Sequence, residues 1–96
     1  MKHISMNDLL KMDLSSITIV DIRSIDRYLS SHIPNAIHID FYDLYYHADQ
    51  YLDPLSTYYI YCDTGMKSKR IVSRLQGLGY KVVNISDGYQ NYLLRK

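Results

Sequence analysis

Several kinds of residue and segment are scarce or missing in this sequence of 96 residues. It has one cysteine, Cys62, so no disulfide can form within the chain and no cysteine cluster can hold zinc. The four histidines have no ligand-like spacing, so we expect neither a metal site nor a cofactor. The longest uninterrupted apolar run is residues 58–62, far shorter than the roughly 20 residues that cross a bilayer. The N-terminal MKHISMNDLL lacks the apolar stretch of a secretory signal. We therefore expect a cytoplasmic protein with no membrane segment.

The charge is nearly balanced, with 11 basic and 10 acidic residues. This balance differs from the strongly basic composition of most nucleic-acid binders, so we expect no nucleic-acid partner. Basic residues nevertheless concentrate between residues 64 and 80, where no acidic residue occurs: Lys67, Lys69, Arg70 and Arg74. A solvated helix face is the ordinary explanation of such a cluster.

Short β-rich runs alternate with helix-like runs along the chain. The runs rich in β-branched and aromatic residues predict strands at 18–23, 36–40, 57–62 and 82–86. Apolar spacing and capping residues predict helices at about 6–10, 25–31, 41–50, 67–78 and 89–94. Ser5 is the expected cap of the first of these, and Gly79 is expected to end the fourth in the left-handed conformation. The alternation indicates a single α/β domain over residues 1–96, with a central, mostly parallel sheet of about five strands and helices on both faces. In such sheets the ligand site lies beyond the carboxyl ends of the strands, where Asp21, Arg23, Asp40 and Cys62 fall.

The loop after Cys62 carries the strongest chemical signal. Gly65 allows the chain to curl, so that loop N–H groups can point at the sulfur. The start of the following helix and Lys67 add positive charge, and both favour a nucleophilic thiolate. A buried free cysteine in the core is the alternative explanation. However, Lys67 and Lys69 in the first turn of a helix are unfavourable unless an anion binds there, so we favour an anion-stabilising nucleophile.

Three motifs occur in the order and spacing of a known family. VDIR at 20–23, with Tyr28 and HIPNA at 32–36, is similar to V-D-x-R … Y-x-x-G-H-I-P-G-A. YCDTGMKS at 61–68 is similar to Y-C-x-x-G-x-R-S, and DG at 87–88 with Tyr92 is similar to G-G-x-x-x-W. From about residue 18 to 92 the sequence therefore resembles the rhodanese-like domain family, specifically its single-domain thiosulfate sulfurtransferases.

The resemblance implies a mechanism and roles for individual residues. Cys62 would take the outer sulfur of thiosulfate or a similar small anionic donor, become a persulfide, and pass the sulfur to cyanide or to a thiol, on a small molecule or on a protein. Lys67 would attract the anionic donor. The cradle of the persulfide would be the backbone of Asp63, Thr64, Gly65, Met66, Lys67 and Ser68. We expect Asp21, Arg23 and His32 to support the site, the first two through internal hydrogen bonds and ion pairs and His32 as a turn residue.

Some positions depart from the family pattern. Lys67 stands where the family often has Arg, so donor binding lacks a bidentate fork. Asp63 places a negative charge beside the nucleophile. Arg27 replaces a Glu, so an ion pair to Arg23 needs another acid, for which Asp26 is a candidate. The sequence also has three changes at glycines and one at a tryptophan: Ser31, Asn35, Asp87 and Tyr92. Of these, Asn35 is mild because Asn tolerates left-handed turns.

Three other functions remain as alternatives. The chain could be a persulfide carrier that delivers sulfur to a protein partner, with residues 67–74 as the docking surface. It could be a non-catalytic rhodanese-like interaction module, although the retained Cys62 argues against this. A phosphatase or arsenate reductase is disfavoured, because related enzymes with those activities have the longer C-x5-R loop, whose Arg position is Ser68 here. The sequence does not specify the oligomeric state.

Overall fold

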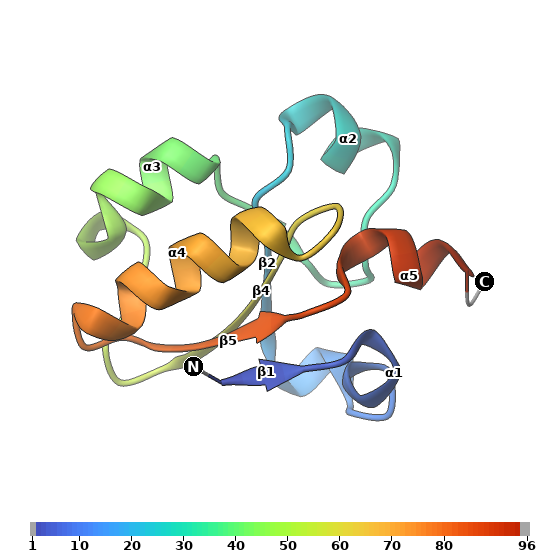
Figure 1. Cartoon of the computed structure of the whole chain (residues 1–96), viewed down its shortest axis with the longest axis horizontal. Helices are drawn as coiled ribbons and strands as arrows, with labels where there is room; N and C mark the ends of the chain where they lie inside the picture. Colours follow the sequence, from blue (N-terminus) through green and yellow to red (C-terminus); the bar gives the residue numbers. More distant parts are fainter. Residues whose placement is uncertain (1, 95–96) are drawn as a thin grey trace.

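The structure, a computed structural model, describes residues 2–94 (Figure 1). The ends of the predicted domain, residues 1, 95 and 96, lie outside the described residues. Five strands form one sheet in the order β1-β5-β4-β2-β3, and every pairing between neighbours is parallel. The strands are β1 (His3–Ile4), β2 (Thr18–Asp21), β3 (Ile37–His38), β4 (Thr57–Tyr61) and β5 (Lys81–Ile85). This confirms the predicted α/β fold with a central parallel sheet.

The described residues also form five α-helices and two short 3₁₀ helices. All of them lie between strands except the last, which follows β5. The α-helices are α1 (Met6–Leu9), α2 (Ile25–Ser30), α3 (Phe41–Tyr46), α4 (Met66–Gly77) and α5 (Gly88–Leu94). The 3₁₀ helices are η1 (Leu14–Ser16) and η2 (Ala48–Gln50). The prediction of one helix over 41–50 was wrong in its second half, because the chain breaks at His47 and continues as η2. Strand β1 was not predicted; it has two residues and takes its regular pairing from β5 alone.

Several local predictions from single residues are confirmed. Ser5 caps α1 by accepting a hydrogen bond from the Asp8 N–H. Gly79 has φ +97° directly after the last turn of α4, where the N–H of Tyr80 bonds to the carbonyl of Leu75. Asn35 adopts φ +71°, the left-handed conformation that Asn tolerates. These residues set the ends of helices and turns, and thereby the lengths of the strands between them.

The two faces of the sheet are covered by different helices. Along β4, Tyr58 and Ile60 point to the face covered by α3 and α4, while Tyr61 points to the face covered by α1 and α5 (Figure 1). Cys62 continues the first set, because side chains two residues apart in a strand share a face. Cys62 and Tyr61 therefore lie on opposite faces of the sheet at the same strand end.

The position of the site follows from the strand order. Strands β2 and β4 are neighbours, but the chain leaves β2 toward β3 at one edge and leaves β4 toward β5 on the other side. The connections after β2 and β4 therefore diverge, and a crevice opens between them at the carboxyl ends of the strands. Residues 22–24 and 62–67 occupy these two connections.

Residues 2–94 contain neither a membrane-spanning helix nor a cluster of metal-binding side chains. No described helix has the length and apolar character needed to cross a membrane. The same residues hold no group of three or more His, Cys, Asp or Glu side chains placed to bind a metal ion.

Candidate active site

The sulfur of Cys62 lies at the centre of the loop between β4 and α4. Its Sγ accepts hydrogen bonds from the backbone N–H groups of Gly65, at 3.2 Å, and Ser68, at 3.3 Å. The Ser68 hydroxyl lies 3.4 Å from Sγ and also bonds to the carbonyl oxygen of Gly65. Cys62 is only 4% exposed. The loop thus directs two backbone donors at a nearly buried sulfur.

Only glycine fits at position 65 of this loop. Gly65 has φ +95°, which L-residues with side chains rarely adopt. A Cβ added there would lie 2.0 Å from the carbonyl oxygen of Ser86. The same residue is the N-cap of α4, so its backbone both curls the loop toward Sγ and leads into the helix.

The start of α5 is hydrogen-bonded to the backbone of the cysteine loop. The N–H groups of Tyr89 and Gln90 donate to the carbonyl oxygens of Cys62, at 2.8 Å, and Asp63, at 2.9 Å. Gly88 permits this approach, since a Cβ at that position would lie 2.5 Å from the carbonyl oxygen of Asp63. Sequence reasoning missed this contact, and its one sequence signal was the Asp-Gly pair at 87–88. These two hydrogen bonds join segments that are 27 residues apart in the sequence.

A pocket of about 350 Å³ opens above the sulfur. Its lining combines residues after β2, residues of α2 and the cysteine loop: Ile22, Arg23, Ser24, Arg27, Cys62, Asp63, Thr64 and Lys67. Three cations face one carboxylate here, so the pocket is suited to a small anion. Arg27 was not predicted as a site residue, because its place beside the pocket depends on how α2 packs over the loop.

Three predicted loop residues do not line the pocket: Gly65, Met66 and Ser68. Ser68 is buried beneath the sulfur, and the backbone of Gly65 lies against Ser86. The Met66 side chain is 69% exposed and does not line the pocket. Gly65 contacts Sγ through its backbone N–H, and Ser68 contacts it through its N–H and its hydroxyl.

Asp21 and Arg23 form a buried ion pair on the opposite face of the sheet from Cys62. Arg23 Nη2 lies 2.7 Å from Asp21 Oδ2, and Arg23 Nε donates to both carboxylate oxygens, at 3.1 and 3.0 Å. Burial alone lowers the pKa of Arg23, but the hydrogen bonds and charge of Asp21 outweigh it and raise this pKa above its ordinary value. The candidate partner Asp26 was wrong, because residues two apart at a strand end share a face and Asp21 reaches Arg23 first.

Two tyrosines complete the surroundings of this pair. Tyr61 donates its hydroxyl to Asp21 Oδ2 at 2.7 Å, and the Arg23 guanidinium lies 4.0 Å from the ring centroid of Tyr89. Burial, and then the Asp21 carboxylate, raise the pKa of Tyr61 far above its ordinary value. The Tyr89 hydroxyl donates to Ser31 Oγ at 2.8 Å, and Arg23 Nη2 donates to the Ser31 carbonyl at 2.6 Å. Arg23 is thus fixed in one orientation at the edge of the pocket.

Asp63 is paired with two arginines, so its negative charge opposes a thiolate at Cys62 less strongly. Its Oδ1 lies 3.3 Å from Arg27 Nη1 and 3.9 Å from Arg23 Nη1. These two guanidinium groups offset the negative charge that the sequence places beside the nucleophile. Arg27, at the position of the family's Glu, has therefore become the partner of a loop carboxylate.

His32 is placed as a turn residue. Its Nδ1 lies 2.7 Å from the carbonyl oxygen of Tyr28, and the two rings stack with centroids 3.9 Å apart. Tyr28 in turn donates its hydroxyl to the Ala36 carbonyl at 2.8 Å. His32 does not line the pocket above Cys62.

Comparison with known proteins gave matches over most of the chain. The sequence profile of the rhodanese-like domain family matches residues 5–95. A Bacillus subtilis (strain 168) protein named "Putative sulfur carrier protein YrkF" is 30% identical over 78 residues, which are 80% of this chain and 42% of that protein. The chain therefore spans less than half of this relative.

Two staphylococcal structures match over most of their length. A rhodanese-like domain protein from Staphylococcus aureus has a TM-score of 0.82 and 30% identity, covering 94% of this chain and 89% of the other. The protein SSP1007 from Staphylococcus saprophyticus has a TM-score of 0.85 and 28% identity, covering 96% and 93%.

Proposed function

This chain belongs to the rhodanese-like domain family, and from that premise we propose that it is a sulfurtransferase that carries sulfur as a persulfide on Cys62. The observation that carries the proposal is the pair of backbone N–H groups on Cys62 Sγ, at 3.2 and 3.3 Å, at the floor of a cationic pocket. A buried structural cysteine needs neither the pocket nor the directed donors.

The first step loads sulfur onto the protein. The Cys62 thiolate attacks the outer sulfur of thiosulfate, forming an Sγ–S bond while the S–S bond of thiosulfate breaks. Sulfite leaves with the bonding electron pair, and Cys62 is left as a persulfide anion, so atoms and charge balance. Lys67 and Arg27 at the pocket wall attract the dianionic donor.

The loop then stabilises the outer sulfur. Met66 and Lys67 are the first residues of α4, and the N–H groups at a helix start have no intrahelical acceptor. Because the loop curls around Sγ, these N–H groups lie beside those of Gly65 and Ser68, which already donate to the sulfur. An acceptor nucleophile attacks the outer sulfur and releases the Cys62 thiolate, which these donors also stabilise.

The test follows sulfite release. Mixed with thiosulfate and no acceptor, the protein should release one sulfite per chain, and cyanide should convert this burst into turnover. Cys62→Ser should release none. Lys67→Gln should lower the second-order rate of loading by about 10-fold, equivalent to about 1.4 kcal/mol. Lys69→Gln, a neighbouring exposed lysine that does not line the pocket, is the matched control. Equal loading by both variants would contradict the role of Lys67.

A second candidate is a carrier that receives sulfur from one protein and delivers it to another. It is favoured by the name of the B. subtilis relative and by residues 67–74. Lys69 and Arg70 are exposed and form no ion pair with any residue between 2 and 94. For a carrier, Lys69→Glu with Arg70→Glu should slow transfer to a protein acceptor while loading from thiosulfate continues. Equal transfer by both forms would remove the support for docking there.

The phosphatase and arsenate reductase alternative lacks a cation where those loops need one. Ser68 occupies the position of their arginine, and its side chain is fully buried under Sγ. No guanidinium therefore stands at this position to bind an oxyanion with two hydrogen bonds. Hydrolysis of an aryl phosphate that disappears in Cys62→Ser would contradict this argument, and failure of every donor to load Cys62 would leave a non-catalytic interaction module.

A further inference from the structure

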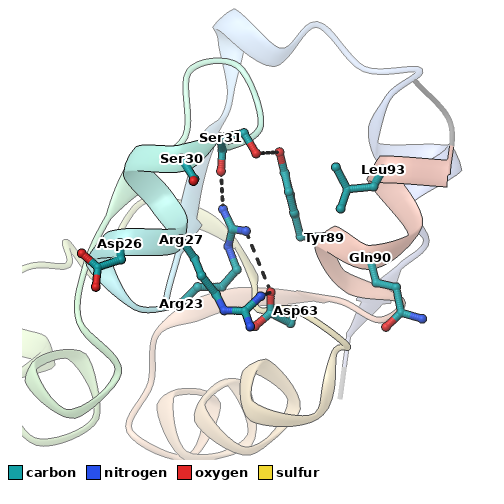
Figure 2. Close-up of a pocket in the computed structure, with 9 residues that line it drawn as sticks. All are labelled: Arg23, Asp26, Arg27, Ser30, Ser31, Asp63, Tyr89, Gln90 and Leu93. Atoms are coloured by element: carbon teal, nitrogen blue, oxygen red, sulfur yellow. Dashed lines mark hydrogen bonds and ion pairs between the residues drawn. The ribbon is translucent and has the colours of Figure 1, made fainter.

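A second and larger hollow lies between α2 and α5, with a volume of about 640 Å³ (Figure 2). We call it the α2–α5 groove. One wall comes from α2 and the residue after it, the other from α5, and the end toward the cysteine loop is Asp63: Arg23, Asp26, Arg27, Ser30, Ser31, Asp63, Tyr89, Gln90 and Leu93. Its volume is within the range of pockets that hold small molecules.

The groove adjoins the pocket above Cys62, because Arg23, Arg27 and Asp63 line both. Two of these shared residues are joined by one hydrogen bond, from Arg27 Nη1 to Asp63 Oδ1 at 3.3 Å. Both side chains are substantially exposed, at 64% and 43%, so the pair is weak and can open for a ligand. A molecule whose body lies in the groove can therefore place its reactive end in the Cys62 pocket.

Arg23 at the floor of the groove is held by several contacts, whereas the charged side chains of its α2 wall, Asp26 and Arg27, have few. Arg23 is fixed by Asp21 and by the ring of Tyr89, as described above. On α2, the Asp26 carboxylate has no hydrogen bond or ion pair with residues 2–94, and the Arg27 guanidinium contacts Asp63 alone there. Figure 2 shows the Arg27 side chain extending toward Asp63, whereas the Asp26 carboxylate points to the other side of α2, away from Tyr89 and Leu93. The cation and the anion that face each other in the groove are therefore Arg27 and Asp63.

We propose that the α2–α5 groove binds the body of the sulfur acceptor, and that this acceptor is a small amino-acid thiol with one ammonium and one carboxylate group. Arg27 pairs with the carboxylate, and Asp63 pairs with the ammonium group. This inference rests on the proposed function, which supplies the persulfide. The acceptor thiol R–S–H gives its proton to the outer sulfur of the persulfide anion, and the thiolate R–S⁻ that remains attacks that sulfur. R–S–S–H forms, the Sγ–S bond breaks, and Cys62 leaves as a thiolate.

The first test fills the groove. Ser30 lines the groove and does not line the Cys62 pocket, whereas its neighbour Leu29 is 70% exposed and lines neither. Persulfide-loaded Ser30→Trp and Leu29→Trp are each mixed with L-cysteine or with cyanide, and loss of the persulfide is followed by intact mass. Cyanide is small enough to enter the Cys62 pocket without the groove. We expect the ratio of the cysteine rate to the cyanide rate to fall at least 10-fold in Ser30→Trp and to stay at the wild-type value in Leu29→Trp.

The second test separates the charges of the acceptor. Wild type and Arg27→Gln are compared with L-cysteine, N-acetylcysteine, cysteamine and 2-mercaptoethanol, each rate being divided by the cyanide rate of the same variant. This division removes any effect of Arg27 on the Cys62 pocket, and comparing variants for one thiol removes differences in thiol reactivity. Arg27→Gln should slow the two carboxylate-bearing thiols about 5-fold and change cysteamine and 2-mercaptoethanol by less than about 2-fold. Asp63→Asn should reverse this preference and slow the thiols that carry an ammonium group, whereas Asp26→Asn should change each ratio by less than about 2-fold.

The outcomes distinguish the groove from the persulfide chemistry. Equal slowing of cysteine and cyanide by Ser30→Trp, or no slowing of either, overturns the groove as the acceptor site. Absence of any persulfide in the wild type overturns the proposed function. In that case S-methylcysteine, which keeps both charges and has no thiol, is titrated against Cys62→Ser and followed by amide NMR. Shifts confined to α2 and α5 that Ser30→Trp abolishes would support the binding site alone, and no shifts would overturn it.

Discussion

Replacing Asp21 with asparagine removes one charge of the buried pair with Arg23 and leaves the other. Asp21 is fully buried, and its carboxylate accepts hydrogen bonds from the N–H and side chain of Arg23 and from the Tyr61 hydroxyl. An asparagine of the same shape presents two donors where one carboxylate oxygen stood. Arg23, whose side chain is 3% exposed, then holds an uncompensated charge.

The expected loss of stability is large for a chain of this size. Breaking a buried ion pair from one side costs about 3–5 kcal/mol, against about 5–15 kcal/mol for the whole free energy of unfolding. With a urea m-value of about 1–3 kcal/mol/M, the midpoint should fall by about 1 M or more. The matched control is Asp8→Asn, because the Asp8–Lys11 pair spans 3.6 Å with both side chains more than half exposed. It should cost no more than about 1 kcal/mol.

Urea unfolding of four proteins tests the reasoning: wild type, Asp21→Asn, Asp8→Asn and the double variant Asp21→Asn with Arg23→Met. If the stranded charge of Arg23 causes the loss, the double variant should be more stable than Asp21→Asn alone. A midpoint for Asp21→Asn equal to that of Asp8→Asn would refute the claim that this pair holds the site together. A double variant that is less stable than Asp21→Asn would refute the stranded charge as the cause.

Two further predictions concern backbone strain and pH. Gly65→Ala should unfold the loop or abolish persulfide formation, because its Cβ would lie 2.0 Å from the Ser86 oxygen. Gly77→Ala, with no atom within 4 Å of its Cβ, should instead stabilise α4 by about 0.5–1 kcal/mol. Sulfite release and urea midpoints measure both effects, and a Gly65→Ala variant that is stable and loads sulfur would contradict the geometry. The pKa of Tyr61 is raised in the folded state, so its contribution to stability is complete below the unfolded pKa of about 10 and is lost as the pH rises above it. Urea midpoints at rising pH should therefore fall more steeply above pH 10 in wild type than in Tyr61→Phe, and parallel falls would count against the Tyr61–Asp21 hydrogen bond.

Features that depend on nearby residues could be predicted from the sequence. The β-branched and aromatic runs gave four of the five strands, and the glycines and serines at helix ends acted as expected at Ser5 and Gly79. The cysteine loop follows from the strand before it and the helix after it, so the N–H groups aimed at Cys62 Sγ could be anticipated from Gly65. Each of these inferences needs a window of only about ten residues.

Features that depend on packing between distant segments could not. The two residues of β1 carry too little pattern, and their place in the sheet depends on Asn84 and Ile85 of β5. The ring of Tyr89 reaches Arg23 across 66 positions of sequence, and the α2–α5 groove exists only because α5 folds back beside α2. The partner of Arg23 is the exception, since the Asp21-x-Arg23 spacing at a strand end was itself a usable signal.

The most direct test of the account is the mass of the intact protein after a brief incubation with thiosulfate. The account predicts a gain of one sulfur atom, located on the peptide that contains Cys62, removed by cyanide and absent in Cys62→Ser. An unchanged mass with thiosulfate and with a small persulfide donor, in a wild-type protein that is folded, would contradict the claim that Cys62 carries sulfur.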